Sequence, residues 1–269
     1  MTEDRGSFIW YELMTDDPAG ARAFYRAVVG WEIEAEGQAL PTGGTYRMIV
    51  RSDGGFAGGV LELTADMKAG GAAPGWLGYI HHPDVDGAVS ALKDAGGAVH
   101  MPPMDMPGVG RMSMVADPQG AVFYVMSPTP PADDPEAKSD VFSVDQAQHM
   151  RWNELWTTDQ DAAVALYAEL FGWTQESAMP MGEMGDYRFI ENDGVGIGAV
   201  GKAQPDGEGS RWQYFAGVDD IDRACAAVTQ NGGKLLSDPQ QIPGGEYTVY
   251  AHDPQGATIG LVGPRSQGA

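Results

Sequence analysis

The chain contains few cysteines and few basic residues, and both shortages exclude classes of function. A single cysteine, Cys225, rules out a disulfide within the chain and is typical of a reducing compartment. Lys and Arg number 16 against 38 Asp and Glu, which gives a formal net charge of −22. Nucleic acids and anionic membranes bind basic surfaces, so we expect neither as a partner.

Long apolar runs are also absent from the sequence. The opening segment MTEDRGSF has no apolar stretch that could act as a secretion signal, and no later segment is long enough to span a membrane. We therefore expect a cytoplasmic protein. With 269 residues, of which 43% are hydrophobic, the chain is long enough to bury the cores of two ordinary domains.

The two halves of the chain repeat each other. FIWYELMTDD near the start has a counterpart in MRWNELWTTD, and both place a tryptophan and a glutamate two residues apart. Other unlike residues recur at a spacing that drifts from 142 to 136 positions, which locates a few gaps in loops. The recurring pairs include Trp10 and Trp152, Glu12 and Glu154, Tyr25 and Tyr167, Gly30 and Gly172, Trp31 and Trp173, Trp76 and Trp212, and the two DPQGA segments from Asp117 and Asp253. Such self-similarity predicts an internal duplication of one domain.

Each copy reads as two βαβββ modules. In the first copy, a strand precedes a helix over DDPAGARAFYRAVVGW, in which Asp17 can cap the start, Pro18 suits the first turn and Gly30 suits the end. Short strands, the strand GWLGYIHH, a helix over DVDGAVSALKDAGG and further strands follow, and the second copy repeats this order. The Pro- and Asp-rich stretch between the copies reads as a surface linker. We predict domains at residues 1–128 and 148–269 with a linker at 129–147.

These motifs resemble the glyoxalase/bleomycin resistance/extradiol dioxygenase superfamily, also called the vicinal oxygen chelate proteins. The resemblance rests on Trp-x-Glu-Leu, on Phe-Tyr followed by Gly-Trp, and on GRMSMVADPQGA, and it covers both copies. Within the superfamily the chain is most similar to tandem two-domain bacterial members. The resemblance implies an α+β fold of two fused domains, each a pair of βαβββ modules that form a cupped mixed sheet with helices outside. It implies less about the reaction, because this fold hosts many chemistries.

Catalytic members of the superfamily usually hold a divalent metal with about four His, Glu or Gln side chains. The matching positions here are Trp10, Glu62, Leu77 and Tyr124 in the first copy, and Trp152, Lys202, Gln213 and Gly260 in the second. At most one good ligand per copy is too few for a stable site, so we expect no cofactor and no inherited metal site. A rearranged divalent site built from Glu62, Gln213 and a histidine is the alternative.

The paired tryptophans and glutamates suggest another kind of site. Strand alternation places Glu12 on the face of Trp10, and Glu154 on the face of Trp152. A carboxylate partly buried beside an aromatic ring has a raised pKa and can act as a general base, so both glutamates are candidate catalytic residues. In the alternative interpretation each glutamate is structural and is held by hydrogen bonds or by an arginine of a neighbouring strand.

Further candidate substrate-binding residues come from neighbouring strands. A tyrosine and an arginine in each copy could bind a carboxylate or enolate oxygen, although alternation sends each arginine to the face opposite its tyrosine. Other candidates stand at former ligand positions or share their face, and two methionines suit an adaptable pocket wall. With Trp10 and Trp152, the predicted set is Tyr46, Arg47, Tyr187, Arg188, Leu77, His81, Tyr124, Met112, Met114 and Gln213.

Three functions are compatible with these residues. The first is an enzyme of the lyase or isomerase type, in which Glu12 or Glu154 transfers a proton on a small carbonyl-bearing or aromatic compound. The second is a non-catalytic protein that sequesters a drug-like or toxic compound, as bleomycin-resistance relatives do. The third is metal-dependent chemistry of the lactoylglutathione lyase type. A small molecule is the expected partner in all three, and the protein is expected to be a monomer or a homodimer.

Overall fold

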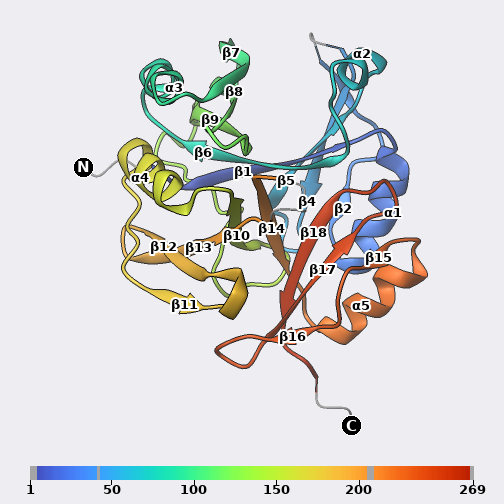
Figure 1. Ribbon diagram of the computed structural model, residues 1–269. Coiled ribbons are helices and arrows are strands. Elements are labelled where there is room, and N and C mark those ends of the chain that lie inside the picture. The colour runs from blue at the N-terminus through green and yellow to red at the C-terminus, as the bar shows by residue number, and fades with distance from the viewer. Residues whose placement is uncertain (1–4, 41–42, 205–208, 267–269) are drawn as a thin grey trace. The chain divides into compact units, whose positions relative to one another are not determined.

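The computed structural model describes residues 5–40, 43–204 and 209–266 (Figure 1). The first copy contains β1 (Phe8–Thr15), α1 (Pro18–Val28), β2 (Glu32–Ile33), β3 (Gln38–Ala39), β4 (Thr45–Val50), β5 (Phe56–Glu62), α2 (Ala65–Ala69), β6 (Gly75–His81), α3 (Val85–Asp94), β7 (Ala98–Met106), β8 (Gly110–Ala116) and β9 (Val122–Pro128). The second copy contains β10 (Met150–Thr157), α4 (Gln160–Phe171), β11 (Ala178–Pro180), the short 3-10 helix η1 (Gly182–Met184), β12 (Asp186–Asn192), β13 (Val195–Lys202), β14 (Arg211–Gly217), α5 (Ile221–Gln230), β15 (Lys234–Leu235), β16 (Gln240–Gln241), β17 (Tyr247–His252) and β18 (Thr258–Gly263).

The strands of each copy belong to one mixed sheet of nine strands. In the first copy, β1 is parallel to β5 and β6 is parallel to β9, whereas β4 with β5 and β8 with β9 are antiparallel. The second copy repeats this pattern with β10 parallel to β13 and β14 parallel to β18. The predicted α+β fold of two fused domains with repeated βαβββ modules is confirmed.

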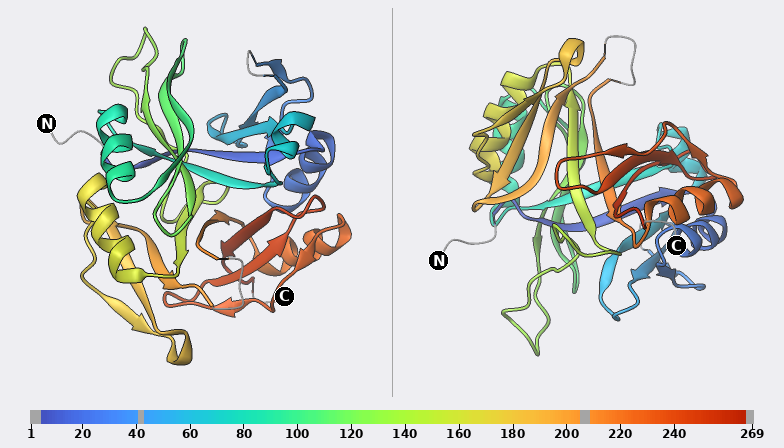
Figure 2. Two further views of the ribbon diagram at one scale, coloured as in Figure 1. Left: turned by 45° about the horizontal axis from the view of Figure 1, so that its top comes forward. Right: turned by 90° about the horizontal axis from the view of Figure 1, so that it is seen from below.

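The compact units of the structure combine modules from both copies. Unit 1 contains the described residues of 1–9, 78–139 and 152–213, and unit 2 contains those of 10–77, 140–151 and 214–269. In unit 1, α3 of the first copy packs beside α4 of the second, and in unit 2, α1 packs beside α5 (Figure 2). The predicted domain boundaries therefore describe the sequence repeat, while the compact units follow the packing of modules.

Aspartates begin the main helices, as the sequence pattern predicts. The side chain of Asp17 accepts a hydrogen bond from the backbone N–H three residues later, and Asp84, Asp159 and Asp220 do the same at their helices. The helix α4 ends at Gly172, whose φ of 76° is the left-handed conformation that glycine adopts readily. In the described part of the chain, no helix is long and apolar enough to cross a membrane.

Several of the duplicated residues form a buried network rather than a site. In unit 1 the Tyr167 hydroxyl donates to Oδ2 of Asp117 at 3.2 Å and accepts from Nε1 of Trp212 at 3.1 Å. Oδ1 of Asp117 accepts the backbone N–H groups of Gln119 and Ala121, which closes the Asp-Pro-Gln-Gly turn. Burial raises the pKa of Asp117, although these hydrogen bonds oppose the shift.

Unit 2 contains the same network with the copies exchanged. The Tyr25 hydroxyl donates to Oδ2 of Asp253 at 3.1 Å and accepts from Nε1 of Trp76 at 2.9 Å. Burial raises the pKa of Tyr25 well above its ordinary value, and the nearby Asp253 adds to this shift. Each network joins a helix of one copy to a turn of the other, which explains why these residues occur twice.

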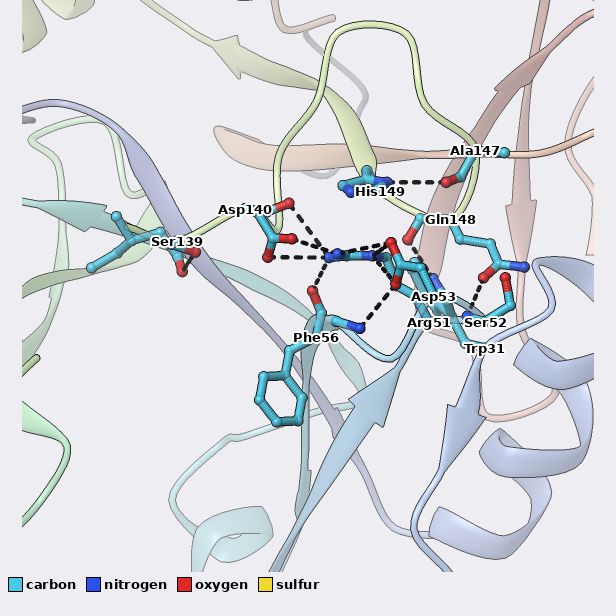
Figure 3. Close-up of polar contacts among 12 residues, drawn as sticks. Trp31, Arg51, Ser52, Asp53, Phe56, Ser139, Asp140, Ala147, Gln148 and His149 are labelled. Carbon is cyan, nitrogen blue, oxygen red and sulfur yellow. Dashed lines mark hydrogen bonds and ion pairs between the residues drawn. The ribbon is translucent and has the colours of Figure 1, made fainter. Parts of the chain in front are cut away.

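The second half of the predicted linker packs against unit 2 (Figure 3). Nη2 of Arg51 lies 2.5 Å from Oδ2 of Asp140, and the same guanidinium contacts Asp53 and the carbonyl of Phe56. Gln148 accepts from the backbone N–H of Ser52 through its side chain. Only 2% of the Arg51 side chain is exposed. The linker therefore contains a segment fixed by a buried arginine, between the exposed residues 129–140 and 144–147.

Candidate functional site

Glu154 on β10 is held by two neutral donors from its own unit. It is buried, with 6% of the residue exposed. Oε1 accepts a hydrogen bond from the Tyr187 hydroxyl at 2.5 Å, and Oε2 accepts one from Nε1 of Trp156 at 2.9 Å. The Tyr187 oxygen in turn accepts a hydrogen bond from Nε1 of Trp152 at 2.7 Å. These four residues, named the Glu154 network, link an indole, a phenol and a carboxylate in one hydrogen-bonded chain.

Strand pairing and one glycine create the space for this network. Trp156 on β10 stands opposite Gly201 on β13, and a Cβ at position 201 would lie 2.6 Å from the Trp156 ring. Phe189 on β12 contacts both Trp152 and Tyr187 edge to face, with ring centroids 6.2 and 5.6 Å away. Aromatic rings therefore surround the carboxylate on the sheet face opposite α4, an environment that suits a flat organic ligand.

The first copy has a related arrangement in unit 2. Nε1 of Trp10 donates to the Tyr46 hydroxyl at 2.7 Å, as in the second copy. The Tyr46 ring crosses Gly59, where a Cβ would lie 2.2 Å from the hydroxyl oxygen, and Gly59 pairs with Glu12 in the sheet. Glu12 is 3% exposed. The structure thus brings the tryptophan and tyrosine of each copy together beside a buried glutamate.

The two copies differ two residues after the glutamate, at the next position on the same face of the strand. Trp156 donates to Glu154, but the corresponding residue of the first copy is Met14, whose thioether cannot donate a hydrogen bond. Neither Trp156 nor Phe189 belongs to the predicted set. Continuing the alternation of Trp152 and Glu154 by one further step would have placed Trp156 on the same face.

The two candidate arginines lie on the other face of their sheets. Arg188 pairs in register with Val200, and its Nη1 lies 2.6 Å from Oδ1 of Asp161 on α4. Arg47 pairs in register with Val60 and donates to Thr45 and Glu62 instead. The structure therefore keeps both arginines away from Tyr46, Tyr187 and the buried glutamates. The hydrogen bonds and ion pairs that they make are consistent with a structural role.

Other predicted residues lie on the strands β6, β8, β9 and β14. Leu77 is 8% exposed on β6, and Gln213 is 7% exposed on β14. Tyr124 on β9 stacks on Tyr79 of β6, with centroids 4.1 Å apart and planes at 9°. The remaining residues of this group, His81, Met112 and Met114, share one face of the strands β6, β9 and β8, and none of these residues belongs to the Glu154 network.

The residues at the inherited ligand positions do not fit a divalent metal. Glu62 pairs in register with Thr15, which places it on the face opposite Glu12, and the hydrogen bond from Thr45 lowers its pKa with help from Arg47. Lys202 is paired in the same way with Thr157. Among the residues that the structure describes, no group of three or more His, Cys, Asp or Glu side chains could hold a metal ion.

Comparisons with known proteins agree on one family. The family model described as "Glyoxalase/Bleomycin resistance protein/Dioxygenase superfamily" matches residues 7–125 and 146–261. The chain is 30% identical to "Putative glyoxylase CFP32" of Mycobacterium tuberculosis over 98% of this chain and 97% of that protein. It is 27% identical to "Anthracycline biosynthesis protein DauV" of a Streptomyces species, over 96% and 93% of the two chains.

Solved structures show the same fold at lower identity. The Mn(II)-bound glyoxalase from Novosphingobium aromaticivorans superposes with a TM-score of 0.64 at 16% identity, covering 96% of this chain and 82% of that one. At this identity the similarity concerns the fold, and the manganese is a property of that protein.

Proposed function

The chain belongs to the Glyoxalase/Bleomycin resistance protein/Dioxygenase superfamily, and from this membership we propose that it binds a small carbonyl-bearing or aromatic molecule and moves a proton with Glu154. The Glu154 network carries the proposal. A carboxylate that is 6% exposed and bonded by Tyr187 and Trp156, with Trp152 and Phe189 beside it, combines a base with aromatic walls.

The proposed reaction begins with transfer of an acidic C–H proton of the substrate to a Glu154 oxygen. The electron pair of that bond moves to the adjacent carbonyl oxygen, which becomes an enolate. Because the carboxyl group becomes neutral, the Tyr187 hydroxyl loses its charged acceptor and can turn its proton toward the enolate oxygen. With a β,γ-unsaturated substrate, return of the proton to the γ-carbon completes an isomerisation. With a leaving group on the β-carbon, departure of that group with its electron pair completes an elimination.

The named relatives support an aromatic carbonyl substrate. The Streptomyces protein is named for anthracycline biosynthesis, and anthracyclines are flat, fused-ring compounds with carbonyl groups. Stacking or edge contacts with Trp152 and Phe189 would hold such a ring system next to the base. In the first copy, Trp10, Tyr46 and Glu12 form the second candidate centre.

The proposal is tested without knowing the natural substrate. Aromatic ketones and quinones are screened by quenching of tryptophan fluorescence, and bound compounds are then followed by NMR in D2O for exchange of their acidic C–H protons. We expect exchange that is lost in Glu154→Gln while ligand binding persists. Glu12→Gln is the matched variant of the other copy. Exchange that is unchanged in both variants refutes proton transfer by these glutamates.

Sequestration without catalysis is the second candidate function. The edge-to-face cluster of Trp152, Tyr187 and Phe189 favours it, because aromatic surfaces bind drug-like compounds without any need for a base. Tight binding at one molecule per site, with no proton exchange and no effect of Glu154→Gln, is the result expected for this function.

A further inference from the structure

Four adjacent strands of unit 1 carry a row of soft side chains outside the Glu154 network. In the β6–β9 pairing, His81 stands beside Met126. Met126 stands opposite Met112 of β8, and Met112 stands opposite Met104 of β7. Directly paired residues of a sheet point to the same side, so the four residues form one continuous line on one face. We name this line the thioether row.

A second row of paired residues lies on the same face of these four strands. It consists of Tyr79, Tyr124, Met114 and Met101 in the same strand order. The rings of Tyr79 and Tyr124 are stacked at 4.1 Å, which fixes the relative position of β6 and β9 at the level of side chains. Two more thioethers therefore lie one step from the thioether row.

The centre of the thioether row is buried and contains an unsatisfied nitrogen. Met112 and Met126 are 5% and 6% exposed. Within the described residues, Nδ1 of His81 is buried and has no hydrogen-bond partner. Buried polar atoms without partners are uncommon, and a bound ion is one of their ordinary explanations.

We propose that the thioether row binds one soft monovalent cation, Cu(I), through Nδ1 of His81 and the sulfur atoms of Met126 and Met112. Thioether and imidazole ligands select Cu(I), whereas hard divalent ions such as manganese and magnesium require carboxylate or carbonyl oxygens. Paired positions on adjacent strands have Cβ atoms about 4.5–5.5 Å apart, and methionine is flexible enough to bring its sulfur to a shared point between them. Two of the three ligands are thioethers, which the His, Glu and Gln set of the superfamily's divalent site does not include.

The second copy provides an internal comparison. Its equivalent row consists of Gly217, Val262, Thr248 and Gln240, and it contains neither a thioether nor an imidazole. The second copy therefore has the same fold without the histidine and methionine side chains that would bind the ion. One site per chain is expected, in the sheet of the first copy.

The test is an anaerobic competition titration of the full chain with Cu(I) and a coloured Cu(I) chelator. The background variant Cys225→Ser is used because a thiol would bind the same ion. We expect one equivalent of Cu(I), with weakened binding in His81→Gln and loss of binding in Met112→Leu/Met126→Leu. Met184→Leu, at a methionine that is 41% exposed in the second copy, is the matched control and retains binding. Glu154→Gln also retains binding, so the result is independent of the proposed function.

A second measurement requires no substitution in the row. Methionine methyl groups labelled with 13C are followed by NMR while Ag(I), a redox-stable substitute for Cu(I), is added to the Cys225→Ser chain. Shifts confined to Met112, Met126 and their neighbours support the proposal. Absence of stoichiometric Cu(I) binding, or binding that is insensitive to His81, Met112 and Met126, overturns it.

Discussion

Replacing Tyr167 with Phe removes a single oxygen from the interior of unit 1. That oxygen donates to Asp117 and accepts from Trp212, and all three residues are at most 6% exposed. The aromatic ring remains, stacked at 5.2 Å on Trp173, so little packing is lost. The change therefore isolates two buried hydrogen bonds.

The expected cost follows from the groups that the change leaves without partners. A buried polar group that loses its hydrogen bond costs about 1–3 kcal/mol. The Trp212 N–H loses its bond to the Tyr167 oxygen, whereas Asp117 keeps the backbone N–H groups of Gln119 and Ala121 and bears the lower part of the range. We expect the free energy of unfolding to fall by about 2–4 kcal/mol in total.

Urea unfolding followed by circular dichroism measures this loss. Tyr25→Phe makes the equivalent change in unit 2, beside Asp253 and Trp76, and is expected to cost a similar amount. Tyr247→Phe is the control, because its half-buried ring keeps its packing on the Arg265 guanidinium and the hydroxyl loses only a hydrogen bond to this partly exposed arginine. A loss below about 0.5 kcal/mol for Tyr167→Phe, the size of an ordinary surface substitution, would refute the reasoning.

Three further changes test other parts of the structure. Burial raises the pKa of Asp117 in the folded state, so the stability that protonated Asp117 contributes is full below its unfolded pKa and is lost as the pH rises through the folded pKa. Asp117→Asn should therefore reduce the change in unfolding free energy between acidic and neutral pH, measured by urea titration at each pH. Arg51→Met removes the buried partner of Asp140 and should lower stability by about 1–3 kcal/mol and speed proteolysis of the linker; an unchanged cleavage rate would contradict the assigned contact. Gly201→Ala places a Cβ in the Trp156 ring and should cost about 1–3 kcal/mol and alter tryptophan fluorescence, whereas an unaltered spectrum would show that the ring does not depend on this glycine.

The sequence predicts the fold well because its signals are local and repeated. Asp17 and its equivalents define helix starts, and the duplicated motifs carry the resemblance to the superfamily. The register of the strand pairs and the hydrogen-bond partners of the duplicated side chains could not be predicted from local signals. Tyr25 and Asp253 are duplicated residues far apart in the sequence, and only packing of one copy against the other brings their side chains together.

The candidate site was predictable in part. Alternation places Glu154 and Trp152 on one face, and it also separates Arg188 from Tyr187, as the structure has them. Trp156 is missing from the prediction because the alternation was followed only over the duplicated Trp-x-Glu pair, and the next residue on that face differs between the copies.

Comparison of the two copies separates the scaffold from the chemistry. The identical positions Tyr25 and Tyr167 make hydrogen bonds from one copy to the other, so a change in either would break a pairing within its own unit. The sheet faces share the Trp-Tyr-Glu set, but the copies diverge beside it: Trp156 corresponds to Met14, and His81 corresponds to Gly217. Since a hydrogen-bonded glutamate and a row of thioethers are suited to different ligands, the duplication supplies one scaffold with two faces that need not perform the same task.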